Sequence, residues 1–215
     1  RAVVLRGENG NANRVVGAMQ DISTEYFYKQ LQSIENEVMQ ESMRLNTSLK
    51  TILKKYLLHL EKLLPEIRAT ILKIQDNKVY NLMSPSMPKA YIDTIEGTEI
   101  GPNTGSCGTA AFLKEKVIVE DINKDFRWKD YKYLGDLYGF RACWSVPIFN
   151  TSGDVVATFA NYYKTPKKPK KIEIQAIERS QKLISILLER FTYLESLKLS
   201  NERNDYIHKA TNDAI

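Results

Sequence analysis

The sequence predicts an α+β domain that is built on an antiparallel sheet and carries long helices at both ends. Two pairs of segments rich in β-branched and aromatic residues are each joined by a short turn, 68–75 with 78–83 and 140–149 with 155–163. Such pairs are typical of β-hairpins, whose strands run antiparallel. The flanking segments contain no glycine or proline and repeat apolar residues at helical spacing. With 43% hydrophobic content, the 215 residues allow one sizeable domain plus extensions.

Composition argues against several classes of protein. The 31 basic and 26 acidic residues give a net charge of +5, which does not require a nucleic-acid partner. The most basic segment, 164–171, contains two prolines and is typical of a solvated loop. The two cysteines form no CxxC pair, and we find neither a signal peptide nor an apolar run of the about 20 residues that span a membrane. We therefore expect a cytoplasmic fragment without nucleic-acid or membrane contacts.

The first residues have the pattern of a closing hairpin. Residues 2–5 are strand-like and 7–11 have turn composition. Gly17, Asp21 and Ile22 match the Gly-x-x-x-Asp-Ile-Thr ending of PAS domains, with Ser23 in place of threonine. Residues 1–23 therefore resemble the C-terminal remnant of a PAS domain.

The segment from Ser23 to Pro65 predicts one long helix. Leu31, Val38, Leu45 and Ile52 recur every seven residues, the spacing that keeps one stripe against a partner helix. From Leu45 the apolar stripe broadens, as expected for a helix that lies on a domain. We expect residues 24–48 to form a linker helix.

The central stretch, 101–148, brings both cysteines and both tryptophans together. Its glycine-rich loop at 101–108 runs into a helix, and backbone N–H groups at a helix start can hold a polar or anionic small molecule. The same residues also fit a plain loop-to-helix junction. The other elements expected are a short helix at 90–95, a strand at 116–120, a helix at 128–138 and a last helix at 172–199.

The strand from Phe140 alternates in character. Side chains on a strand point to opposite faces in turn, so Ala142, Trp144, Val146 and Ile148 share one face. Arg141, Cys143 and Ser145 share the other. The apolar face suits a helix layer, and the mixed face suits a pocket.

Five motifs occur in order along residues 49–192: Leu64-Pro65 with 68–71, 105–111, 117–122, Trp128-x-x-Tyr131 and 139–148. With these motifs the segment resembles a GAF domain, of the kind that lies between PAS domains in sensor histidine kinases and cyclic-dinucleotide enzymes. The resemblance implies a central antiparallel sheet with helices on both faces, the first and last helices on one face and a small-molecule pocket on the other.

Polar and aromatic residues of the central stretch are the candidate ligand site. The resemblance implies that the segment with Glu120, Asp121, Trp128 and Tyr131 covers the pocket. Arg141 could instead pair with Asp121 or Glu120 for structural reasons, since buried charges are normally paired. The candidate ligand-binding residues are Cys107, Thr109, Glu120, Asp121, Trp128, Tyr131, Arg141, Cys143 and Ser145.

The C-terminal residues 193–215 continue the last helix and then resemble the start of another PAS domain, with Glu202-Arg203 followed by 210–215. The implied function is a sensory small-molecule-binding module, itself not an enzyme. It would relay a signal through dimeric helices to an effector elsewhere in a parent protein, a histidine kinase or a cyclase.

Three alternatives remain open. The GAF module could serve only for dimerisation. It could be a thiol enzyme, since some GAF domains reduce free methionine sulfoxide. Cys107 precedes a glycine as in those enzymes, but the segment 128–139, where their attacking cysteine lies, contains none. Cys107 is therefore expected to lack a thiol partner, with Cys143 packing in the strand. A photoreceptor or haem domain would need a well-placed anchor, and His59 and His208 lie outside the expected pocket. We expect no metal and no cofactor.

Amphipathic helices at both ends predict a parallel homodimer, because the apolar stripes exceed what one sheet can cover. The predicted seams are Leu31, Val38, Leu45 and Ile52 in the first helix, and Ile177, Ile184, Leu187, Phe191 and Leu194 in the last.

Overall fold

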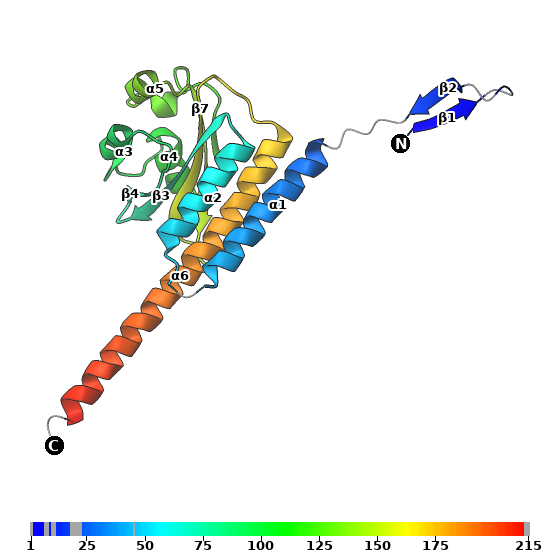
Figure 1. Cartoon of the computed structure of the whole chain (residues 1–215). Helices are drawn as coiled ribbons and strands as arrows, with labels where there is room; N and C mark the ends of the chain where they lie inside the picture. The colour runs from blue at the N-terminus through cyan, green and yellow to red at the C-terminus, as the bar shows by residue number, and fades with distance from the viewer. Residues whose placement is uncertain (1, 7–8, 10–11, 18–22, 45, 213–215) are drawn as a thin grey trace.

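The computed structural model describes residues 2–6, 9, 12–17, 23–44 and 46–212, and Figure 1 shows the arrangement of their elements. The strands are β1 (Ala2–Arg6), β2 (Ala12–Gly17), β3 (Ile67–Gln75), β4 (Lys78–Met83), β5 (Val117–Val119), β6 (Ala142–Phe149) and β7 (Val155–Tyr163). The helices are α1 (Ser23–Ser42), α2 (Leu49–Leu63), α3 (Lys89–Ile95), α4 (Gly105–Leu113), the 3-10 turn η1 (Phe126–Trp128), α5 (Lys132–Tyr138) and α6 (Lys171–Asn212).

Five strands form the predicted antiparallel sheet, in the order β4-β3-β7-β6-β5. The turn between β3 and β4 places Asp76 and Asn77 at φ 51° and 57°, the left-handed conformation that these residue types tolerate. The second predicted hairpin, β6 with β7, turns at Asn150, whose backbone N–H donates to Asp154. Both hairpin predictions are confirmed.

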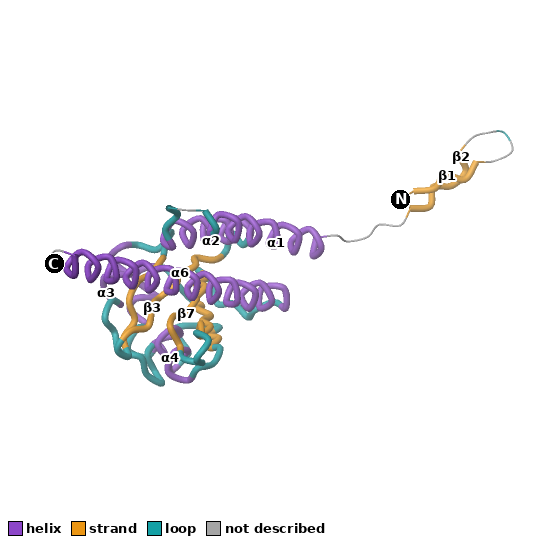
Figure 2. The backbone as a smooth tube through the Cα atoms, turned by 90° about the horizontal axis from the view of Figure 1, so that it is seen from below, coloured by secondary structure: helices purple, strands orange, loops and turns teal. Residues whose placement is uncertain are grey.

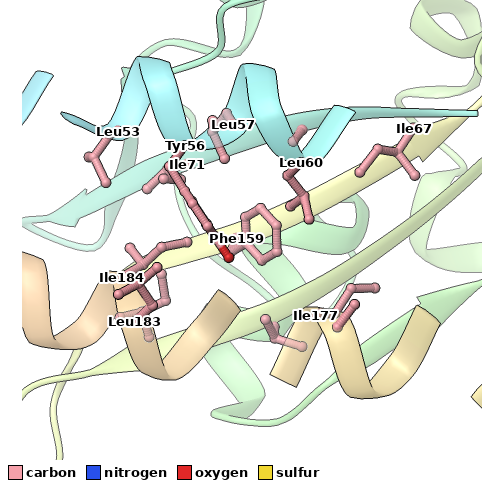
Figure 3. Close-up of a cluster of buried hydrophobic side chains, with 14 of the residues drawn as sticks. Leu53, Tyr56, Leu57, Leu60, Ile67, Ile71, Phe159, Ile177, Leu183 and Ile184 are labelled. Carbon is pink, nitrogen blue, oxygen red and sulfur yellow. The ribbon is translucent and has the colours of Figure 1, made fainter. Parts of the chain in front are cut away.

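Two apolar clusters lie on opposite faces of this sheet. The first holds Ala142, Trp144, Val146 and Ile148 of β6 together with side chains of α2 and α6. Figure 3 shows the centre of this cluster, where α2 and α6 lie side by side on the same face of the sheet. The side chains that meet there are Leu53, Tyr56, Leu57 and Leu60 of α2, Ile177, Leu183 and Ile184 of α6, and Ile67, Ile71 and Phe159 of the sheet. The second cluster includes Cys143 of β6 with side chains of α3, α4 and η1. The predicted alternation along β6 is therefore confirmed.

The sequence predicted one continuous helix up to Pro65, but the structure divides this segment into two helices. The first ends at Ser42, the chain turns through Asn46 at φ 72°, and α2 begins after Ser48. Ser48 caps α2 by accepting a hydrogen bond of 3.2 Å from the backbone N–H of Thr51. Asparagine and serine favour such turns and caps over a helix interior, so they interrupt the seven-residue repeat without glycine or proline.

As a result α1 folds back against α2 and α6, on the side away from the sheet (Figure 2). Arg179 of α6 binds Glu35 of α1 through two hydrogen bonds, and Lys55 of α2 contacts Glu37 and Glu41 at 2.8 and 2.6 Å. Arg190 donates to the carbonyl of Ser42 at 3.1 Å, which satisfies a carbonyl at the end of α1.

The predicted dimer seam in the first helix is thereby occupied within one chain. Leu31, Val38 and Ile52 are fully buried, and so are Ile184 and Leu187 of α6. Because these side chains pack in the chain's own core, they are not a free seam for a second copy. Leu45 lies outside the described residues.

Helix α6 runs well beyond the sheet (Figure 1) and extends past the predicted end at residue 199. Its described side chains from Thr192 onward are exposed, including Leu194 and Leu197. Among the described residues, no helix combines the length and the apolar character that crossing a membrane requires. The resemblance of both ends to PAS domains stays a prediction, and its residues Asp21, Ile22 and 213–215 lie outside the described part.

Candidate functional site

A cavity of about 40 Å³ lies between the sheet and the layer formed by α3, α4 and η1. Its walls are mainly aromatic and aliphatic, and among the described residues that line it none carries a charged side chain. The lining residues are Leu72, Val79, Tyr91, Ile95, Thr98, 104–108, Trp128, Tyr131, Leu134 and Tyr162. The site therefore suits a small neutral molecule and offers no charged group to the anion that the glycine-rich loop suggested.

Helix α4 forms one wall because its first turn can lie very close to its neighbours. Gly105 begins the helix at φ 56°, a conformation that favours glycine, and faces the Trp128 ring. At Gly108 a Cβ atom would stand only 2.7 Å from the Cβ of Thr104. These glycines permit the close contacts of α4 with Trp128 and Thr104, and α4 rests on β6 and β7.

Trp128 is held in place by a chain of hydrogen bonds. Its indole N–H donates to the hydroxyl of Ser106 at 3.0 Å, and that hydroxyl donates to the carbonyl of Cys143 at 3.0 Å. The 3-10 turn that carries Trp128 is capped by Asp125, which accepts from the backbone N–H of Arg127 at 2.9 Å. The cavity wall is thus fixed to the central sheet.

Two buried tyrosines form the floor. The hydroxyl of Tyr91 donates to that of Tyr162 at 3.1 Å, and their rings meet edge to face with centroids 5.7 Å apart. Burial raises the pKa of both phenols well above the ordinary value, so they stay neutral. The hydroxyl of Tyr162 also lies 3.6 Å from the sulfur of Cys107.

The two cysteines are neighbours, which corrects the expectation that Cys107 lacks a thiol partner. Both are free and buried, with Cys107 on α4 at the cavity and Cys143 on β6 beneath it. The hydrogen bond from Cys143 is the largest influence on Cys107; with smaller contributions from nearby hydroxyls it outweighs burial and lowers the pKa of Cys107 to about 7. Burial and the adjacent Cys107 raise the pKa of Cys143, which keeps its proton. In this pair, therefore, ionisation is favoured at Cys107, and Cys143 stays protonated.

Three buried hydroxyls lie on the same sheet face. Thr70, Ser145 and Thr158 are fully buried, and none has a hydrogen-bond partner at ordinary distance among the described atoms. Ser145 and Thr158 nevertheless lie close enough to the Cys107 sulfur to lower its pKa. Such unpaired buried groups are uncommon in folded proteins, because each costs free energy.

The structure brings together five of the nine predicted site residues. Cys107, Trp128 and Tyr131 line the cavity, while Cys143 and Ser145 lie buried on β6 below Cys107.

The other four predicted residues lie elsewhere. Thr109 is buried in α4 and donates to the carbonyl of Pro102. Glu120 is exposed, and Arg141 pairs with Asp121 at 3.3 Å near the sheet edge, as the structural alternative proposed. Burial raises the pKa of Asp121, but hydrogen bonds from Asn123 and Arg141 outweigh it and keep the pKa below its usual range.

Tyr91, Ser106 and Tyr162 line the cavity but were not among the predicted site residues. Tyr162 could have been found, because the same alternation that places Cys143 on the pocket face applies to β7 once the hairpin register is known. Tyr91 lies on a short helix with no sequence pattern that points toward the sheet.

Comparisons with known proteins agree with this fold. The model of the family described as GAF domain matches residues 48–188. The chain is 28% identical over its whole length to the methyl sulfide methyltransferase-associated sensor of Methanosarcina acetivorans, of which it spans 22%.

Two solved structures are similar in fold. One is the free methionine-R-sulfoxide reductase of Neisseria meningitidis in complex with its substrate, with a TM-score of 0.60, 15% identity, and coverage of 81% of this chain and 94% of that one. The other is the GAF domain of a phosphoenolpyruvate-protein phosphotransferase of Coxiella burnetii, with a TM-score of 0.62, 12% identity, and coverage of 78% and 98%.

Proposed function

The chain belongs to the GAF domain family, and we propose that it is a sensory module whose input is a small molecule bound in the cavity beneath α4. The output passes through the sheet to the helix layer, and along α6 to an effector elsewhere in a parent protein. A histidine kinase is the effector we favour, with a cyclic-dinucleotide enzyme as the alternative.

The observation that carries this proposal is that one strand, β6, contacts α4, which forms a wall of the cavity, on one face and α6 on the other. Near its start the carbonyl of Cys143 accepts from Ser106 of α4, and at its end the carbonyl of Phe149 accepts from Ser185 of α6 at 2.7 Å. A displacement of α4 by a bound molecule would therefore act on the strand that supports α6.

The sensory role is further supported by the name of the relative in Methanosarcina acetivorans, a sensor. Because this chain spans about a fifth of that protein, the effector and the direction of signalling are proposals. We also propose a homodimer, whose interface we assign to the exposed part of α6 around Leu194.

A thiol enzyme is the second candidate, and the adjacent cysteines favour it. The cavity argues against a free amino acid as substrate. Methionine sulfoxide carries an ammonium and a carboxylate group, and no charged side chain among the described lining residues would pair with them. Turnover of methionine sulfoxide with a thiol-regenerating system, lost in both Cys107→Ser and Cys143→Ser, would favour the enzyme instead.

Native mass spectrometry of the chain isolated from its own host tests the sensory proposal. The bound molecule should appear as added mass that is lost on denaturation. Leu134→Phe fills part of the cavity and should abolish the added mass, whereas Leu137→Phe on the same helix, with its side chain 69% exposed, should keep it. An unmodified mass for the unchanged chain, or equal added mass in both variants, would contradict the proposal.

A further inference from the structure

The cavity ends at a sulfur atom that is surrounded by proton donors. Cys107 lines the cavity, and its sulfur lies 3.6 Å from the Tyr162 hydroxyl. Cys143 belongs to the same buried cluster and is near enough to lower the pKa of Cys107. The buried hydroxyls of Ser145 and Thr158, which have no other partner among the described atoms, lie on the same side. Such a setting stabilises a thiolate and can donate protons to a leaving group.

The second cysteine is placed to react with the first but is itself shielded. Cys143 is fully buried, does not line the cavity, and is held under α4 by the hydrogen bond from Ser106, the residue next to Cys107. A molecule entering the cavity therefore meets Cys107 before Cys143.

The size and charge of the cavity define what can enter. A volume of about 40 Å³ corresponds to only a few water-sized molecules, since one water needs roughly 10–15 Å³ on this scale. The described lining offers no cationic side chain, and the Cys107 thiolate would repel an anion, so a neutral reactant of a few atoms is favoured over an anion.

From this arrangement we infer that Cys107 and Cys143 are a peroxide-sensing thiol pair, in which a small neutral hydroperoxide oxidises Cys107 and the result is a Cys107–Cys143 disulfide. This inference rests on the sensory role and names the class of its input. The reaction is stoichiometric and needs no electron donor within the domain.

The Cys107 thiolate attacks one peroxide oxygen, the O–O bond breaks, and the departing hydroxide takes a proton to leave as water. Cys107 is then a sulfenic acid, oxidised by two electrons. The Cys143 sulfur attacks the Cys107 sulfur, the S–O bond breaks, and the hydroxide leaves as water with the Cys143 proton. Two thiols are oxidised to one disulfide, and hydrogen peroxide is reduced to two waters.

The disulfide would change the contact between α4, the wall of the cavity, and β6, and we call this side of the sheet the input face. A disulfide links α4 to β6 covalently beside the Ser106–Cys143 hydrogen bond. The strand that supports α6 would then be tied to the cavity wall, which connects oxidation to the proposed output.

The full chain treated with hydrogen peroxide, denatured and alkylated with N-ethylmaleimide tests this inference. Intact mass should show a loss of about 2 Da with no alkylation, the signature of an internal disulfide. In Cys143→Ser the reaction should stop at a sulfenic acid on Cys107 that dimedone traps. In Cys107→Ser, Cys143 should remain fully alkylated.

Access gives a second readout. Cumene hydroperoxide is too bulky for the cavity. Once the rate of each peroxide is divided by its rate with a free thiol, cumene hydroperoxide should oxidise Cys107 at least about tenfold more slowly than hydrogen peroxide does. Leu134→Phe should slow the reaction, whereas Leu137→Phe should not. The inference would be overturned if Cys143 in the Cys107→Ser variant were oxidised as fast as the thiols of the unchanged chain. It would also be overturned if both thiols of the unchanged chain were still alkylated after a peroxide treatment that fully oxidises a free thiol. Either result would leave the native mass experiment free to support another ligand.

Discussion

The indole nitrogen of Trp128 lies 3.0 Å from the hydroxyl of Ser106, and this hydrogen bond joins η1 to α4 at the edge of the cavity. Ser106 donates onward to the carbonyl of Cys143 on β6. One small side chain therefore connects three elements, and all three residues are buried.

Replacing Ser106 by alanine should leave the Trp128 N–H and the Cys143 carbonyl without their partner. Because unpaired buried groups are costly, we expect the free energy of unfolding to fall by about 2 kcal/mol. Urea denaturation followed by tryptophan fluorescence measures this. Ser196→Ala is the control, since that serine is exposed and bonds only within α6; equal losses in the two variants would contradict the assigned role.

Gly108→Ala should destabilise the domain, although alanine normally favours a helix interior over glycine by about 1 kcal/mol. The new Cβ atom would stand 2.7 and 2.8 Å from the Cβ and Cγ2 atoms of Thr104. Overpacking of this kind costs roughly 1–3 kcal/mol. The double variant with Thr104→Gly removes both of these atoms and should recover most of the loss in a denaturation cycle, whereas a stabilising Gly108→Ala would show that the close approach is absent.

The stability of the chain should increase with pH across the range set by Cys107. In the folded chain the pKa of Cys107 is about 7, below the ordinary value of 9.0. The stability that ionisation of Cys107 contributes is therefore complete above the pKa of the unfolded chain and is lost as pH falls through about 7. A shift of this size corresponds to at most about 3 kcal/mol. The facing groups Cys143, Tyr91 and Tyr162 have raised pKa values and remain neutral in this window.

The measurement is the difference in unfolding free energy between the unchanged chain and Cys107→Ser at pH 6 to 9. We expect this difference to grow as pH rises, because only the thiol gains stability on ionising. A difference that is constant with pH would mean that Cys107 is not ionised near neutrality.

Strand alternation and turn chemistry were sufficient to predict the two hairpins of the sheet and the two faces of β6. Trp144 and Cys143 were assigned to opposite faces because neighbouring strand residues must point apart, and the structure confirms it. Asp76 and Asn77 identified a hairpin because their side chains tolerate positive φ. These features depend on a few adjacent residues, which the sequence displays directly.

Features that depend on contacts between distant residues could not be predicted in the same way. From the sequence alone, the apolar repeat through Leu31 and Val38 could pack equally well against a second copy of the chain or against the chain's own α2 and α6. The choice depends on the turn at Asn46 and on the ion pair between Glu35 and Arg179, 144 residues apart. The adjacency of the cysteines likewise depends on how α4 rests on β6.

The exposed stripe of α6 predicts where a dimer forms. Leu194 continues the apolar line of Leu187 and Phe191 beyond the sheet, and its side chain is 40% exposed. We expect a homodimer by light scattering at micromolar concentration, weakened by Leu194→Asp. Leu199→Asp, at an exposed leucine on another side of the helix, should leave it intact. A monomeric unchanged chain, or equal effects of both variants, would contradict this seam.

The most direct test of the assigned input face uses the two tryptophans, which lie on opposite faces of the sheet. Trp128 lines the cavity, and Trp144 packs in the helix layer. Xenon is a neutral probe that enters small apolar cavities. In the chain labelled with nitrogen-15 tryptophan, xenon pressure should shift the indole resonance of Trp128 in a saturating manner and leave that of Trp144 in place, and Leu134→Phe should suppress the shift. An unmoved Trp128 resonance, or equal shifts of both indoles, would contradict an input site beneath α4.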